Sequence, residues 1–148
     1  MYRLLLVIVL AMSPISELRG AIPTALGFGF EPVFVYLLTV VFNALVFFPI
    51  FFGLKYVYSF FDRFSLFRKW VRRAREKGHE PLEKYGFLGL IPFVAIPLPI
   101  TGAWTATLIA WLFDVDWWKA FIAIAIGVCI AGSIVMLGSL GVISFLWW

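Results

Sequence analysis

Two apolar segments of this chain, residues 3–30 and 86–113, are each interrupted near the middle by proline. An α-helix rises about 1.5 Å per residue and needs roughly 20 residues to cross a bilayer, so the short apolar pieces beside each break cannot cross alone. Each broken segment is followed by a longer apolar run, residues 33–61 and 117–148, and both runs are long enough to cross. The order of short run, break, short run and long run therefore occurs twice.

The composition excludes an ordinary soluble domain. Apolar residues make up 64% of the chain and charged residues 14%, against about 45–50% and 25% in soluble domains. We therefore predict an all-α, multi-pass integral protein of the plasma membrane, forming a single membrane domain over residues 1–148. The chain has one cysteine and one histidine, and it lacks the residue sets of nucleophilic, metal and phosphate-loop chemistry. We expect no enzyme activity, metal or cofactor.

The positive charge is concentrated between the two halves. Nine of the 12 Lys and Arg residues fall in residues 55–84. Because cytoplasmic loops carry such an excess, we place residues 62–85 in the cytoplasm and expect no nucleic-acid binding. Apolar residues recur every three or four positions over residues 60–77, which predicts a basic amphipathic helix on the membrane surface. Its expected contacts with anionic lipids are Arg63, Arg68, Lys69, Arg72, Arg73 and Arg75.

The two halves align as an internal repeat, with residues 1–61 as repeat 1 and residues 86–148 as repeat 2. An offset of 82 residues places Gly20-Ala21 on Gly102-Ala103. Identity is confined to this pair, but the order of elements matches throughout. The residues expected to form the breaks and allow close approach there are Pro14, Gly20, Pro23, Pro97, Pro99 and Gly102.

Each broken segment is either one kinked span or a re-entrant helical hairpin. Kinked spans give four crossings and cytoplasmic termini, whereas hairpins give two crossings, external termini and an inverted repeat. Non-helical backbone at membrane depth is tolerated only where it is buried in protein or lines a wet cavity. We favour hairpins, each followed by a transmembrane helix, that share a site at the midplane, as in inverted-repeat transporters.

Two motifs carry a resemblance to a known family. They are SPISELRGAIP over residues 13–23 and PFVAIPLPITGAW over residues 92–104. With the order of elements, they make the chain resemble the small multi-drug export protein family, a branch related to the DedA/VTT superfamily. The resemblance implies two re-entrant hairpins meeting tip to tip and a role in transport or lipid translocation, with a carrier-lipid phosphate or phospholipid as substrate. It also implies membrane-embedded acids and arginines in both halves. Glu17 and Arg19 match this in the first half, whereas Thr101 stands where a second arginine is expected.

The candidate site is built on Glu17 and Arg19, since ionisable groups at membrane depth are costly and are functional candidates by default. Arg19, together with backbone N–H groups at a helix start, suits an anionic head group. A carboxyl group removed from water holds its proton more tightly, so Glu17 is expected to couple proton movement. Ser16 and Thr101 would supply neutral hydrogen bonds. Asn43 either reaches the cavity or joins helices.

Three functions remain open from the sequence. The first is a proton-coupled transporter or lipid translocase for an anionic lipid or small amphiphile. The second is a small drug/proton antiporter that uses Glu17. The third is a structural or assembly protein in which Glu17 and Arg19 form a buried pair. Since two half-size repeats have little bulk to enclose a pathway, we expect a homodimer.

Overall fold

The structure, a computed structural model, describes residues 1–61, 86–96 and 102–146, and every regular element in these ranges is helical. The predicted all-α class is confirmed for this part of the chain. The elements are α1 (Tyr2–Met12), α2 (Glu17–Gly27), α3 (Pro32–Leu45), α4 (Phe47–Phe61), the 3-10 helix η1 (Gly86–Gly89), α6 (Leu90–Ala95), α7 (Ala103–Leu112) and α8 (Trp117–Leu146). The predicted basic amphipathic helix lies outside the described residues.

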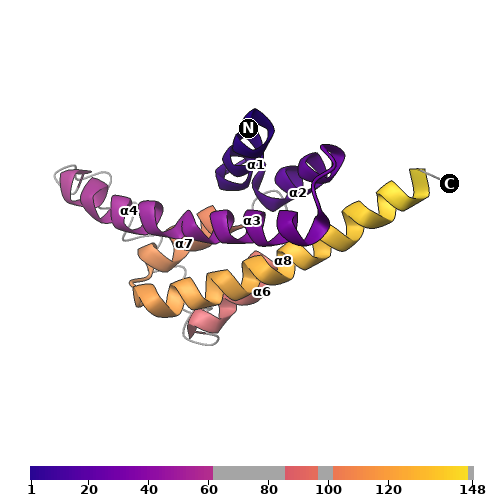
Figure 1. The fold of residues 1–148 in the computed structure, drawn as a ribbon. Coiled ribbons are helices and arrows are strands. Elements are labelled where there is room, and N and C mark those ends of the chain that lie inside the picture. Colours follow the sequence, from indigo (N-terminus) through magenta and orange to yellow (C-terminus); the bar gives the residue numbers. More distant parts are fainter. Residues whose placement is uncertain (62–85, 97–101, 147–148) are drawn as a thin grey trace.

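The first apolar segment breaks where its sequence requires. Ser13, the residue before Pro14, has extended backbone angles (φ −73°, ψ 138°), because the proline ring disfavours helical angles at the preceding position. The chain turns over residues 13–16, and α2 then begins at Glu17. The two helices pack against each other, and they lie together above α3 in Figure 1.

Pro23 corrects one expectation, because it lies inside α2 and not at a break. Its ring holds φ near the helical value, so the helix continues through it, although Pro23 has no N–H to donate to the carbonyl oxygen of Arg19 four residues earlier. The break of the first apolar segment is therefore formed around Pro14 alone.

Within the described residues, two helices are long and apolar enough to cross a membrane, Pro32–Tyr58 and Trp117–Val142. The first begins at Pro32, with the Glu31 carboxylate accepting hydrogen bonds from the backbone N–H groups of the first turn. It is interrupted at Val46 between α3 and α4. Pro49 explains the interruption, since it cannot donate a hydrogen bond to the carbonyl oxygen of Leu45.

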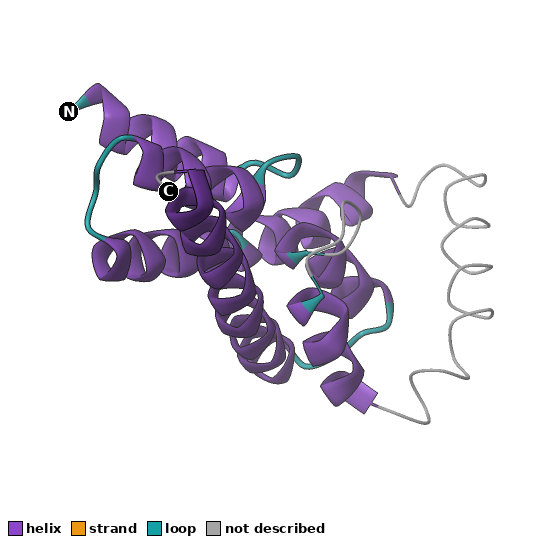
Figure 2. Cartoon of the chain, turned by 90° about the vertical axis from the view of Figure 1, so that its right-hand side faces the viewer, coloured by secondary structure: helices purple, strands orange, loops and turns teal. Residues whose placement is uncertain are grey.

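The helices of the two halves contact one another in matching ways. The first short helix of each half packs on the long helix that follows it, α1 on α3 and α6 on α8. The second short helix of each half also reaches the long helix of the other half, α2 on α8 and α7 on α4. The long helices α3 and α8 also pack together. In Figure 1, α1 and α2 lie above α3 and α6 lies below α8, and Figure 2 shows the described helices in a view turned by 90°. Exchanging the two halves leaves this scheme of contacts unchanged.

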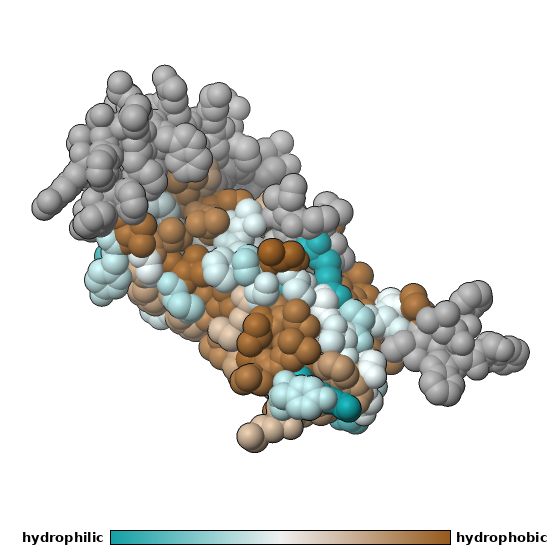
Figure 3. Space-filling view, turned by 90° about the horizontal axis from the view of Figure 1, so that it is seen from above, coloured by the Kyte–Doolittle hydropathy of each residue, from teal (hydrophilic) through white to brown (hydrophobic). Residues whose placement is uncertain are grey.

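Small residues let α8 approach its neighbours closely. Ala123 is fully buried, and a side chain at Gly127 would meet the backbone of α6 at Ile91. The opposite face of α8 carries large exposed apolar side chains, among them Ile122 and Ile126. Apolar side chains also cover large areas of the face shown in Figure 3. Such exposed apolar surface suits a lipid environment.

Candidate functional site

The break between α1 and α2 exposes carbonyl groups that other helices satisfy. The last carbonyls of a helix have no partner within it. At the end of α1, the carbonyl oxygen of Ala11 accepts a 2.7 Å hydrogen bond from the Asn43 side chain of α3, and that of Met12 accepts a 2.9 Å bond from the indole N–H of Trp104 in α7. Both carbonyl groups, which would be costly to leave without a hydrogen bond at membrane depth, thus have a donor. The donor to Met12 comes from the second half of the chain.

Glu17 stands at the restart of the helix with an unusual backbone. Its φ of +46° lies in the left-handed region, which non-glycine residues seldom occupy. Such strained residues persist only where the surrounding structure holds them, and they cluster at functional sites. The backbone N–H of Glu17 donates to the Ser13 carbonyl oxygen at 3.1 Å, so the break itself fixes this conformation.

The carboxylate of Glu17 reaches the second half of the chain. It accepts a hydrogen bond from the backbone N–H of Trp104, and a methyl group at Gly102 would overlap it. Gly102 is the N-cap residue of α7 and has no side chain to cap that helix. Glu17 therefore takes the place of a capping residue, where the partial positive charge of a helix N-terminus favours an anion.

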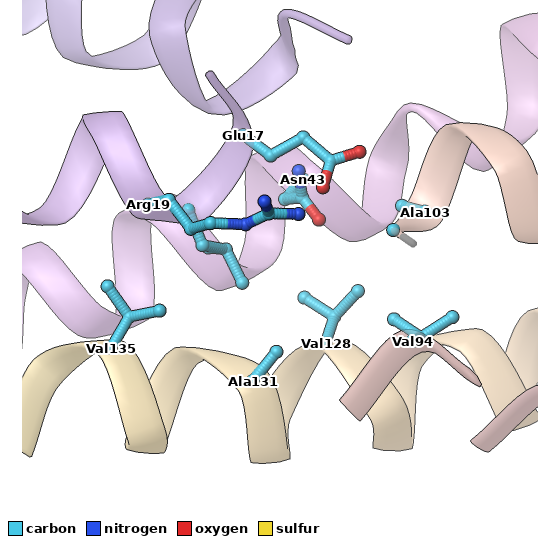
Figure 4. A pocket seen from close by; sticks show the side chains of 10 residues that line it. Glu17, Arg19, Asn43, Val94, Ala103, Val128, Ala131 and Val135 are labelled. Carbon is cyan, nitrogen blue, oxygen red and sulfur yellow. The ribbon is translucent and has the colours of Figure 1, made fainter. Parts of the chain in front are cut away.

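Arg19 lies two residues further along α2 and attracts the Glu17 carboxylate electrostatically. Figure 4 shows the side chains of Glu17, Arg19 and Asn43 gathered on one side of a small space, with Val128 and Ala131 of α8 on the other. The structure thus brings together three of the five predicted substrate- or proton-binding residues.

The space between them is a cavity formed by both halves. Its volume is about 10 Å³, close to the least that holds one water molecule. A cavity of this size has no room for a molecule larger than water. Its lining residues are Glu17, Leu18, Arg19, Asn43, Val94, Gly102, Ala103, Val128, Ala131 and Val135.

The other predicted residues are placed differently. Ser16 does not line the cavity, and its hydroxyl oxygen lies against the backbone of Gly20 in the first turn of α2. Pro14 is exposed in the turn. Thr101, Pro97, Pro99 and the six basic residues expected to contact anionic lipids lie outside the described residues.

Trp104 is the site residue that sequence reasoning missed. Its backbone N–H donates a hydrogen bond to the Glu17 carboxylate, and its indole N–H donates one to the carbonyl oxygen of Met12 at the end of α1. One signal was available, since an indole N–H inside an apolar segment needs a hydrogen-bond acceptor when it is buried.

The described part of the chain contains no candidate metal site, because no three His, Cys, Asp or Glu side chains in it lie close enough together to hold an ion. The side chains of this site can instead bind charge, donate hydrogen bonds and exchange a proton.

The comparisons with known proteins give one family. The family model described as "putative small multi-drug export protein" matches residues 17–134, which include all of the first long apolar helix and most of the second. Neither a curated protein nor a solved structure matches the chain.

Proposed function

The chain belongs to the small multi-drug export protein family, and from this premise we propose that it is a membrane transporter or lipid translocase for an anionic lipid or small amphiphile. The family description favours transport over catalysis. We place the binding site at the cavity where the two broken segments meet, and we assign its chemistry to Glu17 and Arg19.

The observation that carries the proposal is the Glu17 carboxylate bound at the start of α7. An acidic group from the first half occupies a helix N-terminus of the second half, beside a guanidinium group. These are the groups that would bind an anionic head group. The carboxylate and a substrate anion therefore compete for one place.

This competition suggests how a proton is coupled. Protonation removes the negative charge of Glu17 and weakens its hold on both Arg19 and the N–H of Trp104. Those groups then become available to the anionic head group of a substrate. Loss of the proton restores the carboxylate and displaces the anion, so the proton and the anion would move together.

The arrangement in the membrane is part of the proposal. The scheme of helix contacts, which is unchanged when the halves are exchanged, supports an inverted repeat of a re-entrant hairpin and a transmembrane helix. We propose one domain, with residues 1–61 and 86–148 as the repeats and residues 62–85 as a cytoplasmic connector that contacts anionic lipids. Two crossings place both termini outside the plasma membrane. A distant relation to the DedA/VTT superfamily agrees with this arrangement.

A second copy of the chain is also proposed. A cavity of about 10 Å³ within one copy offers no route for an amphiphile, and a homodimer would supply additional walls for one.

The test is transport of a fluorescent alkyl phosphate into proteoliposomes under a pH gradient. Each charge-assisted hydrogen bond is worth about 1.5–3 kcal/mol, so Glu17→Gln and Arg19→Ala should each slow transport about 10- to 100-fold. Asp116→Asn is the matched control, because it removes an exposed carboxylate that pairs with Lys119 away from the cavity. Transport at the wild-type rate by both site variants would mean that the charge pair only joins the two halves.

The drug/proton antiporter is the alternative that the same experiment separates. A cationic drug would bind the Glu17 carboxylate in place of Arg19. Arg19→Ala should then retain or increase transport of a cationic amphiphile, while Glu17→Gln abolishes it.

A further inference from the structure

A second, larger hollow lies along α4. Its volume is about 370 Å³, within the range of small-molecule binding sites, about 300–1,000 Å³. All the side chains around it are apolar apart from the indole N–H of Trp104, which is already bonded to Met12. We call this hollow the α4 groove, and it is lined by Met12, Val46, Pro49, Ile50, Gly53, Leu54, Val57 and Trp104.

The α4 groove is elongated along the helix. Val46, Ile50, Gly53 and Val57 follow one another at intervals of three or four positions, so they share one face of the helix. At 1.5 Å per residue, this face extends over about 16 Å. A row of apolar side chains with a glycine in its middle suits an extended hydrocarbon chain better than a polar ligand.

Trp104 lies between the α4 groove and the charged cavity. Its side chain lines the groove, while its backbone N–H binds the Glu17 carboxylate. The two residues before it, Gly102 and Ala103, line the cavity itself. The groove and the cavity therefore both lie against the first turn of α7, where Trp104 lines one and Gly102 and Ala103 line the other.

We propose that the α4 groove holds the hydrocarbon chain of a single-chain amphiphile while its anionic head group occupies the cavity at Glu17 and Arg19, after the helices around that cavity have moved apart. The proposal rests on the proposed function and defines its substrate class. A chain that moves from the bilayer into an apolar groove never enters water, so only the head group has to be desolvated. The position of the groove beside the charged cavity favours this occupant, because one molecule with an apolar chain and an anionic head group would fill both places.

The variant that tests the groove is Gly53→Leu. A side chain at Gly53 meets no atom within 4 Å, and leucine is a better helix former than glycine. The variant should fold, and its side chain should occupy the space of the hydrocarbon chain. Gly138→Leu is the matched control, because a side chain at Gly138 on α8 also meets nothing within 4 Å but lies outside the groove.

The experiment uses the full chain in phosphatidylcholine proteoliposomes. The probe is dodecyl phosphate with a photoreactive diazirine at the end of its chain, and adducts are mapped by mass spectrometry. We expect adducts on residues 46–57 that excess dodecyl phosphate removes and excess dodecanol does not. Because filling an apolar site discriminates by about tenfold or more, Gly53→Leu should reduce both adducts and transport by that factor, with Gly138→Leu at the wild-type level.

The outcomes separate the two proposals. Adducts spread equally over α4 and the exposed face of α8, or unchanged adducts in Gly53→Leu, would show that the groove holds only bulk lipid. If Glu17→Gln and Arg19→Ala still slow transport in that case, the proposed function stands and the proposed occupant of the α4 groove is wrong. Wild-type transport by those two variants would overturn the proposed function, whatever the adducts show.

Discussion

The contact between Glu17 and Gly102 can be tested with a single methyl group. Gly102 has extended backbone angles (φ 177°, ψ −173°) that any residue adopts, so Gly102→Ala introduces no backbone strain. The three atoms nearest to the new methyl group belong to the Glu17 carboxyl group. That group is the far end of a flexible side chain, so we expect it to move away while the helices keep their places.

The effect on stability follows from what the carboxylate loses. Its hydrogen bond from the Trp104 N–H is charge-assisted and worth about 1.5–3 kcal/mol, whereas replacing glycine by alanine on a compatible backbone stabilises by about 0.4–1 kcal/mol. Gly102→Ala should therefore lower the free energy of unfolding by about 1–2 kcal/mol. Transport should change as well, because Glu17 no longer caps α7.

A double-mutant cycle isolates the cause. In a Glu17→Ala background the carboxylate is absent, so adding Gly102→Ala should leave stability unchanged or raise it slightly. Unfolding in detergent and transport into proteoliposomes measure both effects for the four variants. An equal loss of stability in the two backgrounds would refute the reasoning, because the methyl group would then be meeting something other than Glu17.

Two further predictions concern the framework. A methyl group at Gly127 would lie 2.9 Å from the Ile91 carbonyl oxygen of α6, so Gly127→Ala should destabilise the protein by about 1–3 kcal/mol in thermal unfolding, whereas Gly138→Ala, with nothing within 4 Å, should not. For the re-entrant arrangement, Tyr2→Cys in a Cys129→Ala background should react with an impermeant maleimide added to intact cells. Reaction only after permeabilisation would instead indicate four crossings.

The sequence by itself determined where the first apolar segment is interrupted. Proline acts on its own neighbourhood, by disfavouring helical angles one residue earlier and removing a donor for the carbonyl four residues earlier. Pro14 therefore produces the break that the sequence predicts, and Pro49 interrupts the first long helix through the same physical effect. Pro23 shows the limit of the rule, because a proline can also continue inside a helix whose φ it already matches.

The choice of Glu17, Arg19 and Asn43 as site candidates also came from local reasoning, since charged and amide groups stand out in an apolar sequence. Their arrangement did not. The sequence left two roles open for Asn43, joining helices or reaching the cavity. In the structure it does both, because its side chain donates a hydrogen bond to the Ala11 carbonyl oxygen and lines the cavity.

Only the tertiary structure decided what these groups touch. The partners of the Glu17 carboxylate, Gly102 and Trp104, are more than 80 residues away in the sequence. Nothing in the local pattern around Glu17 points to a helix start in the other half. A break in a helix follows from the covalent geometry of a few neighbouring residues, whereas the partner of a buried polar group depends on which distant helices pack beside it.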